Sequence, residues 1–134
     1  MTMFRSIKVR AASVALAVPV ALGLGVVTAT PAFAGTTLST TGASLMCNVY
    51  QTSQFRGYAD CWLTDTAADS RQVYAVTQVE RFPTKRTTNN RGSGQTIAFR
   101  ENIYIDGRFE FRYKVCRQVN LGGDNCSVWQ TVKS

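Results

Sequence analysis

The chain has 134 residues, with 15 Lys or Arg, eight Asp or Glu, four Cys and no His, and its formal net charge at pH 7 is +7. The absence of histidine excludes Ser-His-Asp and Cys-His nucleophiles and any histidine general base. Paired carboxylates could still hydrolyse glycosides, but the eight acids are scattered along a small chain, so we expect no enzymatic activity.

Residues 1–34 have the pattern of an export signal. Three cations precede an apolar run, and the run ends at Ala-Phe-Ala (32–34), the small-x-small pattern that signal peptidase cleaves. A retained transmembrane helix is the alternative, but one proline and two glycines interrupt the run. We therefore predict cleavage before Gly35, a secreted product and no transmembrane segment after processing. The mature protein keeps 12 of the 15 cations and all eight acids, and this charge of +4 indicates no nucleic-acid partner.

The residues that follow predict an all-β fold. Residues 35–44 are uncharged and rich in Ser, Thr and Gly, which predicts a flexible N-terminal arm or a weak edge strand. From residue 45 onward, apolar and polar residues alternate with a period of two and turn signals separate the runs. The predicted strands are 45–52, 55–64, 73–82, 95–101, 103–105, 108–117 and 126–132. Residues 45–134 are therefore predicted to form one antiparallel, immunoglobulin-like β-sandwich of six or seven strands.

All four cysteines, Cys47, Cys61, Cys116 and Cys126, follow the signal. Their even number and the oxidising destination predict two disulfides. Zinc is the alternative, but no pair has the C-x-x-C spacing and histidine is absent, so no metal or cofactor is expected. Of the three pairings, Cys47–Cys61 and Cys116–Cys126 each join neighbouring strands of a predicted hairpin.

The alternation in 108–117 predicts which way side chains face. Odd positions 109–115 are aromatic or aliphatic and even positions are charged, so one face lies on the core. Cys116 shares the charged parity, which predicts an exterior cystine with Cys126 and an inward Trp129. The same relation is predicted for Cys61 beside Trp62. The aromatic residues predicted to lie in the core are Tyr74, Phe99, Phe109, Phe111, Tyr113, Trp62 and Trp129.

The acids nearest to a cluster are Asp60, Asp65 and Asp69. They lack the alternating ligands and the closing Glu of a calcium loop, and we interpret them as turn formers that bond their own backbone.

Three surfaces are candidates for binding. The first is the arm, with Gly35, Thr36, Thr37 and Leu38, which suits an added strand or a partner's groove; a disordered terminus is the alternative. The second is the connection 82–94, predicted to have no internal structure and to be either a mobile loop or a binder of acidic partners. Its candidate residues are Arg81, Lys85, Arg86 and Arg91.

The third surface is a basic outer face on 108–117. Its residues are Arg108, Arg112, Lys114 and Arg117. Cross-strand pairing with Glu101, Glu80 or Asp60 would make it an ordinary charged sheet face instead.

Three segments, VYAVTQV (73–79), FRYKVCR (111–117) and DNCSVW (124–129), resemble a group of small exported actinobacterial proteins. In that group, a signal peptide precedes a two-disulfide β-domain that ends in a C…NCSxW hairpin. The chain is also similar to the small adaptor subunit of bacterial umbrella toxin particles, which joins a lectin-like subunit to a long scaffold. The N-terminal extension of that subunit enters the partner's cleft, and the resemblance implies this role for residues 35–44.

The leading hypothesis is a secreted, non-catalytic module that binds another secreted protein, as an adaptor in an extracellular assembly. The first alternative is an inhibitor of an extracellular hydrolase that presents Lys85 or Arg86 on the connection 82–94. The second is a binder of anionic cell-envelope polymers through the basic outer face.

Overall fold

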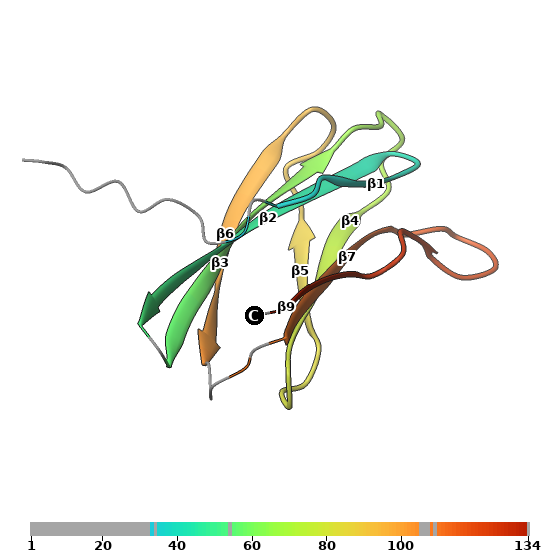
Figure 1. Cartoon of the computed structure of the whole chain (residues 1–134). Helices are drawn as coiled ribbons and strands as arrows, with labels where there is room; N and C mark the ends of the chain where they lie inside the picture. The colour runs from blue at the N-terminus through green and yellow to red at the C-terminus, as the bar shows by residue number, and fades with distance from the viewer. Residues whose placement is uncertain (1–32, 34, 54, 105–107, 109, 134) are drawn as a thin grey trace, which may run out of the picture.

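The computed structural model describes residues 33, 35–53, 55–104, 108 and 110–133. These residues form antiparallel strands and no helix, as the sequence predicted (Figure 1). The strands are β1 (Leu38–Thr40), β2 (Ala43–Ser53), β3 (Arg56–Asp65), β4 (Val73–Val79), β5 (Lys85–Asn89), β6 (Thr96–Tyr104), β7 (Glu110–Arg117), β8 (Asn125–Cys126) and β9 (Gln130–Lys133). The described part of the chain contains no helix able to cross a membrane. The predicted signal peptide lies outside it, apart from Phe33.

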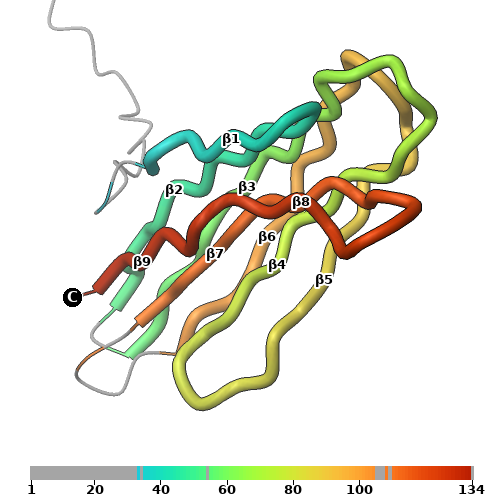
Figure 2. Tube along the Cα trace, turned by 90° about the vertical axis from the view of Figure 1, so that its right-hand side faces the viewer, coloured from blue at the N-terminus to red at the C-terminus, as the bar shows by residue number. Residues whose placement is uncertain are grey.

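The strands make two sheets that face each other (Figures 1 and 2). The first sheet has the order β1-β2-β3-β6, and the second has the order β5-β4-β7-β8, with β9 also paired to β7. The hairpins β2–β3 and β4–β5 lie in different sheets, while β6 returns to β3 and β7 returns to β4. The inner faces of both sheets contribute to one core, so the predicted β-sandwich is confirmed.

Alternation builds this core. Leu45 and Leu63 of the first sheet and Phe111, Tyr113 and Val115 of the second are fully buried. Moving each such side chain out of water contributes roughly 1.5–3 kcal/mol to folding. The predicted facing of the segment 108–117 is confirmed for these described residues, while Phe109 lies outside them.

The connection 82–94 is not without structure, because it contains β5. This strand has the sequence KRTTN and lies at the edge of the second sheet, where β4 is its neighbour. Only Asn89 of its five residues is buried, so no apolar alternation marks the strand. Two smaller differences concern boundaries: residues 95–101 and 103–105 belong to the single strand β6, and residues 126–132 are divided between β8 and β9.

Of the two alternatives for residues 35–44, the structure shows the edge strand. β1 pairs with the start of β2, and Leu38 lies opposite Leu45 in the core. The Tyr113 hydroxyl donates to the Thr36 carbonyl at 2.9 Å. This segment is therefore packed against the sandwich.

Both predicted disulfides are confirmed, but the predicted facing of the first is wrong. Cys47 and Cys61 lie opposite each other across β2 and β3 and are fully buried in the core. They share the parity of Leu45 and Leu63, and this parity puts them inside. Trp62 consequently lies on the outer face and is half-buried, so its predicted inward position is also wrong.

The second disulfide, Cys116–Cys126, has the outer parity that was predicted, although Cys116 is fully buried. Trp129 is not inward. The Arg112 guanidinium and the Lys114 ammonium lie 4.8 and 4.9 Å from the centre of its rings, on the outer face of β7.

Two further aromatic predictions have mixed outcomes. Phe99 packs against the core as predicted. Tyr74 is buried, but it faces outward because it lies opposite Cys116 while its neighbours Val73 and Ala75 face the core.

Candidate functional site

Two exposed aromatic rings lie at the end of the sandwich that carries the β4–β5 turn and the last residue of β6, the lower end in Figures 1 and 2. Phe82 is 50% exposed and Tyr104 is 64% exposed. Their ring centres are 6.4 Å apart. Large apolar side chains that cluster at a surface, rather than in a core, indicate a binding site.

The turn that carries Phe82 is ordered by its own hydrogen bonds. The Phe82 N–H donates to the Val79 carbonyl at 3.0 Å, and the Gln78 side-chain amide donates to the Phe82 carbonyl at 3.1 Å. Arg81 has a φ of 68°, a left-handed conformation that costs a non-glycine residue roughly 1–2 kcal/mol. These two bonds hold the Phe82 backbone in one position.

A shallow hollow of about 170 Å³ lies beside the two rings. Thr77 and Val79 line it from β4. Lys85 and Glu101 also line it and form an ion pair at 3.0 Å, in which the Glu101 side chain is only 11% exposed. We call Arg81, Phe82, Pro83, Lys85 and Tyr104 the lower-end patch. Its hollow has room for one apolar side chain of a partner.

The four cations predicted as one binding loop are not brought together. Arg81 and Lys85 belong to the lower-end patch. Arg86 lies on the outer face of the second sheet, with its guanidinium 3.6 Å from the centre of the Tyr74 ring. Arg91 is exposed beyond the other end of β5.

The predicted basic outer face is reduced to Arg112 and Lys114, which share Trp129. Arg112 also donates to the Gln78 side-chain carbonyl at 2.6 Å. Arg117 leaves this face, since its side chain is 13% exposed and forms an ion pair with Asp69. Arg108 is exposed outside the strand.

The acids that were weighed as cross-strand partners of this face bind other cations. Glu101 pairs with Lys85, Glu80 lies 4.0 Å from Arg81, and Asp60 holds Arg100. The alternative of an ordinary charged face paired to these three acids is therefore wrong.

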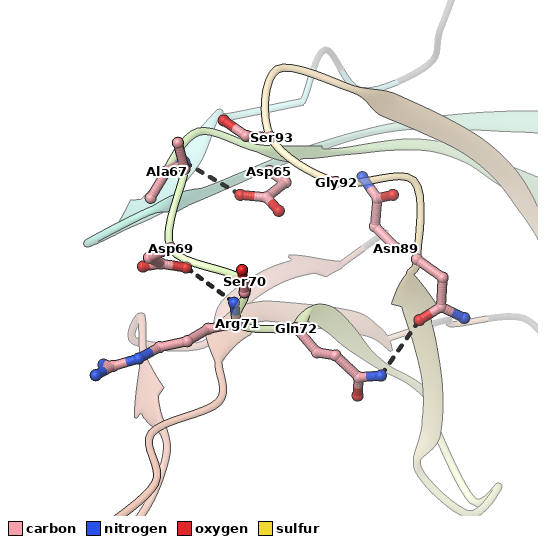
Figure 3. Close-up of a pocket in the computed structure, with 11 residues that line it drawn as sticks. Asp65, Ala67, Asp69, Ser70, Arg71, Gln72, Asn89, Gly92 and Ser93 are labelled. Carbon is pink, nitrogen blue, oxygen red and sulfur yellow. Dashed lines mark hydrogen bonds between the residues drawn. The ribbon is translucent and has the colours of Figure 1, made fainter.

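A polar hollow of about 590 Å³ lies at the opposite end, between residues 65–72 and 89–93 (Figure 3). Asn89 is 2% exposed, and its amide donates to the Leu63 and Gln95 carbonyls at 3.1 and 2.8 Å. Asp65 accepts from the Ala67 N–H at 3.1 Å. The hydrogen bonds of these buried polar groups connect and order the loops, so Asn89 and Asp65 have a structural role here.

The interpretation of Asp65 and Asp69 as turn formers is confirmed, since Asp69 likewise accepts from the Arg71 N–H at 3.0 Å. Asp60 lies elsewhere, on the outer face of the first sheet, bound by Arg100 at 2.6 and 2.9 Å. Across the described ranges, no three acidic or cysteine side chains group to hold a metal ion.

Two buried or bonded tyrosines have shifted pKa values. Burial, and then a hydrogen bond to Asp124, raises the pKa of Tyr74, and the same bond lowers the pKa of Asp124. Burial also raises the pKa of Tyr113. The hydrogen bonds from Tyr74 to Asp124 and from Tyr113 to Thr36 each join distant segments of the chain, so these tyrosines have structural roles.

Sequence reasoning missed the lower-end patch as an aromatic site. It placed Phe82 at the end of a strand, although Pro83 follows it directly. Tyr104 shares its parity with Arg100 and Asn102, and this was the available signal that its ring faces outward. Comparison of the chain with protein-family models, with curated proteins and with solved structures finds no match in any of the three. Its function must therefore be argued from its surface chemistry.

Proposed function

We propose that this chain is an exported, non-catalytic protein-binding module that docks another secreted protein on the lower-end patch and acts as an adaptor in an extracellular assembly. The observation that carries the proposal is the pair of exposed rings, Phe82 and Tyr104, beside a hollow on an ordered turn. Aromatic side chains and arginine dominate the binding energy of protein interfaces. Two local disulfides support a role outside the cytoplasm.

The chemistry of the patch defines the partner. An apolar side chain of the partner would enter the hollow beside the Phe82 and Tyr104 rings, which also has Pro83 in its lining. Arg81 directly precedes Phe82, and its side chain is 79% exposed, against 48% for Glu80, with which it forms an ion pair at 4.0 Å. We therefore expect a partner segment with a central apolar residue and acidic neighbours.

The test compares two double variants, each of which removes two exposed apolar groups. Phe82→Ser with Tyr104→Ser alters the patch, while Leu121→Ser with Val128→Ser alters residues that are 89% and 81% exposed elsewhere. Each purified protein is immobilised and the bound proteins from the producing cell's culture medium are quantified by mass spectrometry. We expect the patch variant to capture at least tenfold less of its partner, because two interface anchors each contribute about 1–2 kcal/mol to binding. Equal capture by both variants would refute the proposal.

The inhibitor hypothesis is the weaker proposal, because it needs Lys85 or Arg86 on a protruding loop. Lys85 and Arg86 lie in β5, where their positions pair with Thr77 and Val76 of β4. This strand lies at the sheet edge and is paired to β4 on one side, so both residues belong to a flat strand. We expect no inhibition of trypsin-like enzymes and slow cleavage after both residues.

Binding of anionic polymers is a second candidate because of one specific arrangement. Arg112 and Lys114 meet over Trp129, and within the described residues neither has a carboxylate partner. If this face binds a polymer, retention must fall as salt rises and must fall further in Arg112→Gln with Lys114→Gln. Unchanged retention in that variant would exclude this face.

A further inference from the structure

Within the described residues, only part of the edge of β2 is covered. β2 has 11 residues, and β1 pairs with three of them, Ala43 to Leu45. Among the described residues, the next backbone partner along this edge is Phe33, which lies antiparallel to Val49. The Phe33 N–H donates to the Val49 carbonyl and the Val49 N–H donates to the Phe33 carbonyl, both at 3.2 Å.

Phe33 also fills an apolar position. It lies opposite Val49, an inward-facing residue that is 1% exposed, and its half-buried side chain packs against the core. Phe33 therefore completes both the hydrogen bonding and the apolar packing of this stretch of β2.

One glycine allows this path. Five residue steps separate Phe33 from Leu38, while four separate their partners Val49 and Leu45, so the outer segment accommodates one extra residue. Gly35 lies in this bulge, where a Cβ would be only 1.9 Å from the Cys47 carbonyl oxygen. Phe33 and residues 35–40 thus follow the edge of β2 as one interrupted strand.

The predicted cleavage site, directly before Gly35, falls inside this strand, and one residue separates Phe33 from it. We infer that Phe33 is a placeholder: cleavage before Gly35 removes it and opens the edge of β2 at Val49 to an extended segment of a partner protein. This acceptor edge goes beyond the lower-end patch, although it rests on the same proposed export. Exposed strand edges are templates for an added strand, whose side chains then confer specificity.

Water can replace the two hydrogen bonds of Phe33, but it cannot replace its apolar packing. The edge beyond Val49 continues through Gln51 and Ser53, which are polar and exposed. The fitting occupant is therefore a short extended peptide segment that runs antiparallel to β2. It carries a large apolar side chain opposite Val49 and, N-terminal to that side chain, polar residues opposite Gln51 and Ser53.

The experiment uses the exported protein purified from culture medium, with its N-terminus read by mass spectrometry. Hydrogen exchange of the Val49 amide is followed by NMR, alone and with the synthetic peptide ATPAFA, which has the sequence of residues 29–34. The matched control is ATPASA. We expect rapid exchange alone, at least tenfold slowing with ATPAFA and no slowing with ATPASA.

Three results would overturn the inference: an exported chain that retains Phe33, a Val49 amide that is already protected without peptide, or equal effects of the two peptides. Because an isolated peptide can bind weakly, the same exchange is measured in the full 134-residue chain, refolded and oxidised. There Phe33→Ser should speed exchange at Val49, and an unchanged rate would contradict the inference. The Phe82→Ser and Tyr104→Ser variant should bind ATPAFA normally, so failure at one surface is distinguishable from failure at the other.

Discussion

The two disulfides close similar hairpins but lie on different faces of the sandwich. Cys47–Cys61 joins β2 to β3 inside the core, and its sulfurs pack among Leu45, Val49 and Leu63. Cys116–Cys126 joins β7 to β8 on the outer parity of the second sheet. Strand pairing determines which cysteines bond, but the parity of their neighbours determines where the bond lies. A cystine can therefore be paired correctly from sequence and still be placed on the wrong face.

The largest expected effect is a difference in unfolding free energy between variants that lack one or the other disulfide. The two disulfide loops span 14 and 10 residues, so chain entropy assigns each about 3 kcal/mol. Both sulfurs of Cys47–Cys61 lie in the core, whereas Cys126 is only half-buried, so replacing the first pair by Ala leaves the larger cavity and adds roughly 1–2 kcal/mol. We expect urea unfolding to show a loss of about 4–5 kcal/mol for this variant and about 3 kcal/mol for Cys116→Ala with Cys126→Ala. Equal losses would contradict the interior position of the first bond.

The tryptophan beside the outer cystine sharpens the same contrast. Trp129 lies under two cations on the outer face rather than in the core. Trp129→Ala should therefore cost roughly 1–2 kcal/mol, whereas Phe111→Ala should cost about 3–5 kcal/mol. Urea unfolding of both variants measures the difference. If Trp129→Ala lost as much unfolding free energy as Phe111→Ala, the outer position of the Trp129 side chain would be contradicted.

A smaller effect is expected at Tyr113, on the inner face of β7. The Tyr113 hydroxyl bonds to Thr36, so Tyr113→Phe should cost about 1 kcal/mol. Because burial raises the pKa of Tyr113, the native state favours the neutral phenol. Its contribution is complete below the ordinary pKa of 10.0 and is lost as the pH rises through the raised value. Unfolding measured between neutral and alkaline pH should show a steeper decline in the wild type than in Tyr113→Phe, where the raised pKa of Tyr74 still contributes; parallel curves would contradict the assignment.

The smallest effect is expected at the hydrogen bond between Tyr74, on the outer face of β4, and Asp124. The Tyr74 hydroxyl donates to Asp124, which lowers the pKa of Asp124 below 3.8. The stabilisation is present above pH 3.8 and is lost as the pH falls through the lowered value. Solvent screens this exposed carboxylate, so the effect is slight. Asp124→Asn should flatten the acid limb of the stability profile measured by tryptophan fluorescence, and an identical limb would show that the bond has no influence.

The strands with apolar alternation were predictable from the sequence, and the polar edges were not. β7 has an uninterrupted alternation, and its described residues face as expected. β5 has a polar sequence and exists because β4 offers an edge, so only the tertiary partner forms it. The inward position of Cys61 could have been predicted, because Trp62 shares its parity with Asp60 and Thr64.

The candidate site was less predictable than the fold. Arg81 and Lys85 were expected to bind, but the association of Phe82 and Lys85 with Tyr104 depends on the β4–β5 turn lying beside the end of β6. That proximity brings together residues about 20 positions apart, on two different sheets, and the local sequence pattern cannot predict it. The pairing of Phe33 with Val49 likewise follows from the arrangement in space.

Photo-crosslinking tests the proposed docking surface most directly. A benzophenone side chain is placed at Tyr104 or, as a control, at Val128, and each secreted protein is irradiated in the medium of the producing cells. The lower-end patch predicts one saturable protein adduct from position 104, absent at position 128 and reduced when Phe82→Ser is combined with the probe. The same adducts at both positions, or none at position 104, would contradict a protein partner at this end of the sandwich.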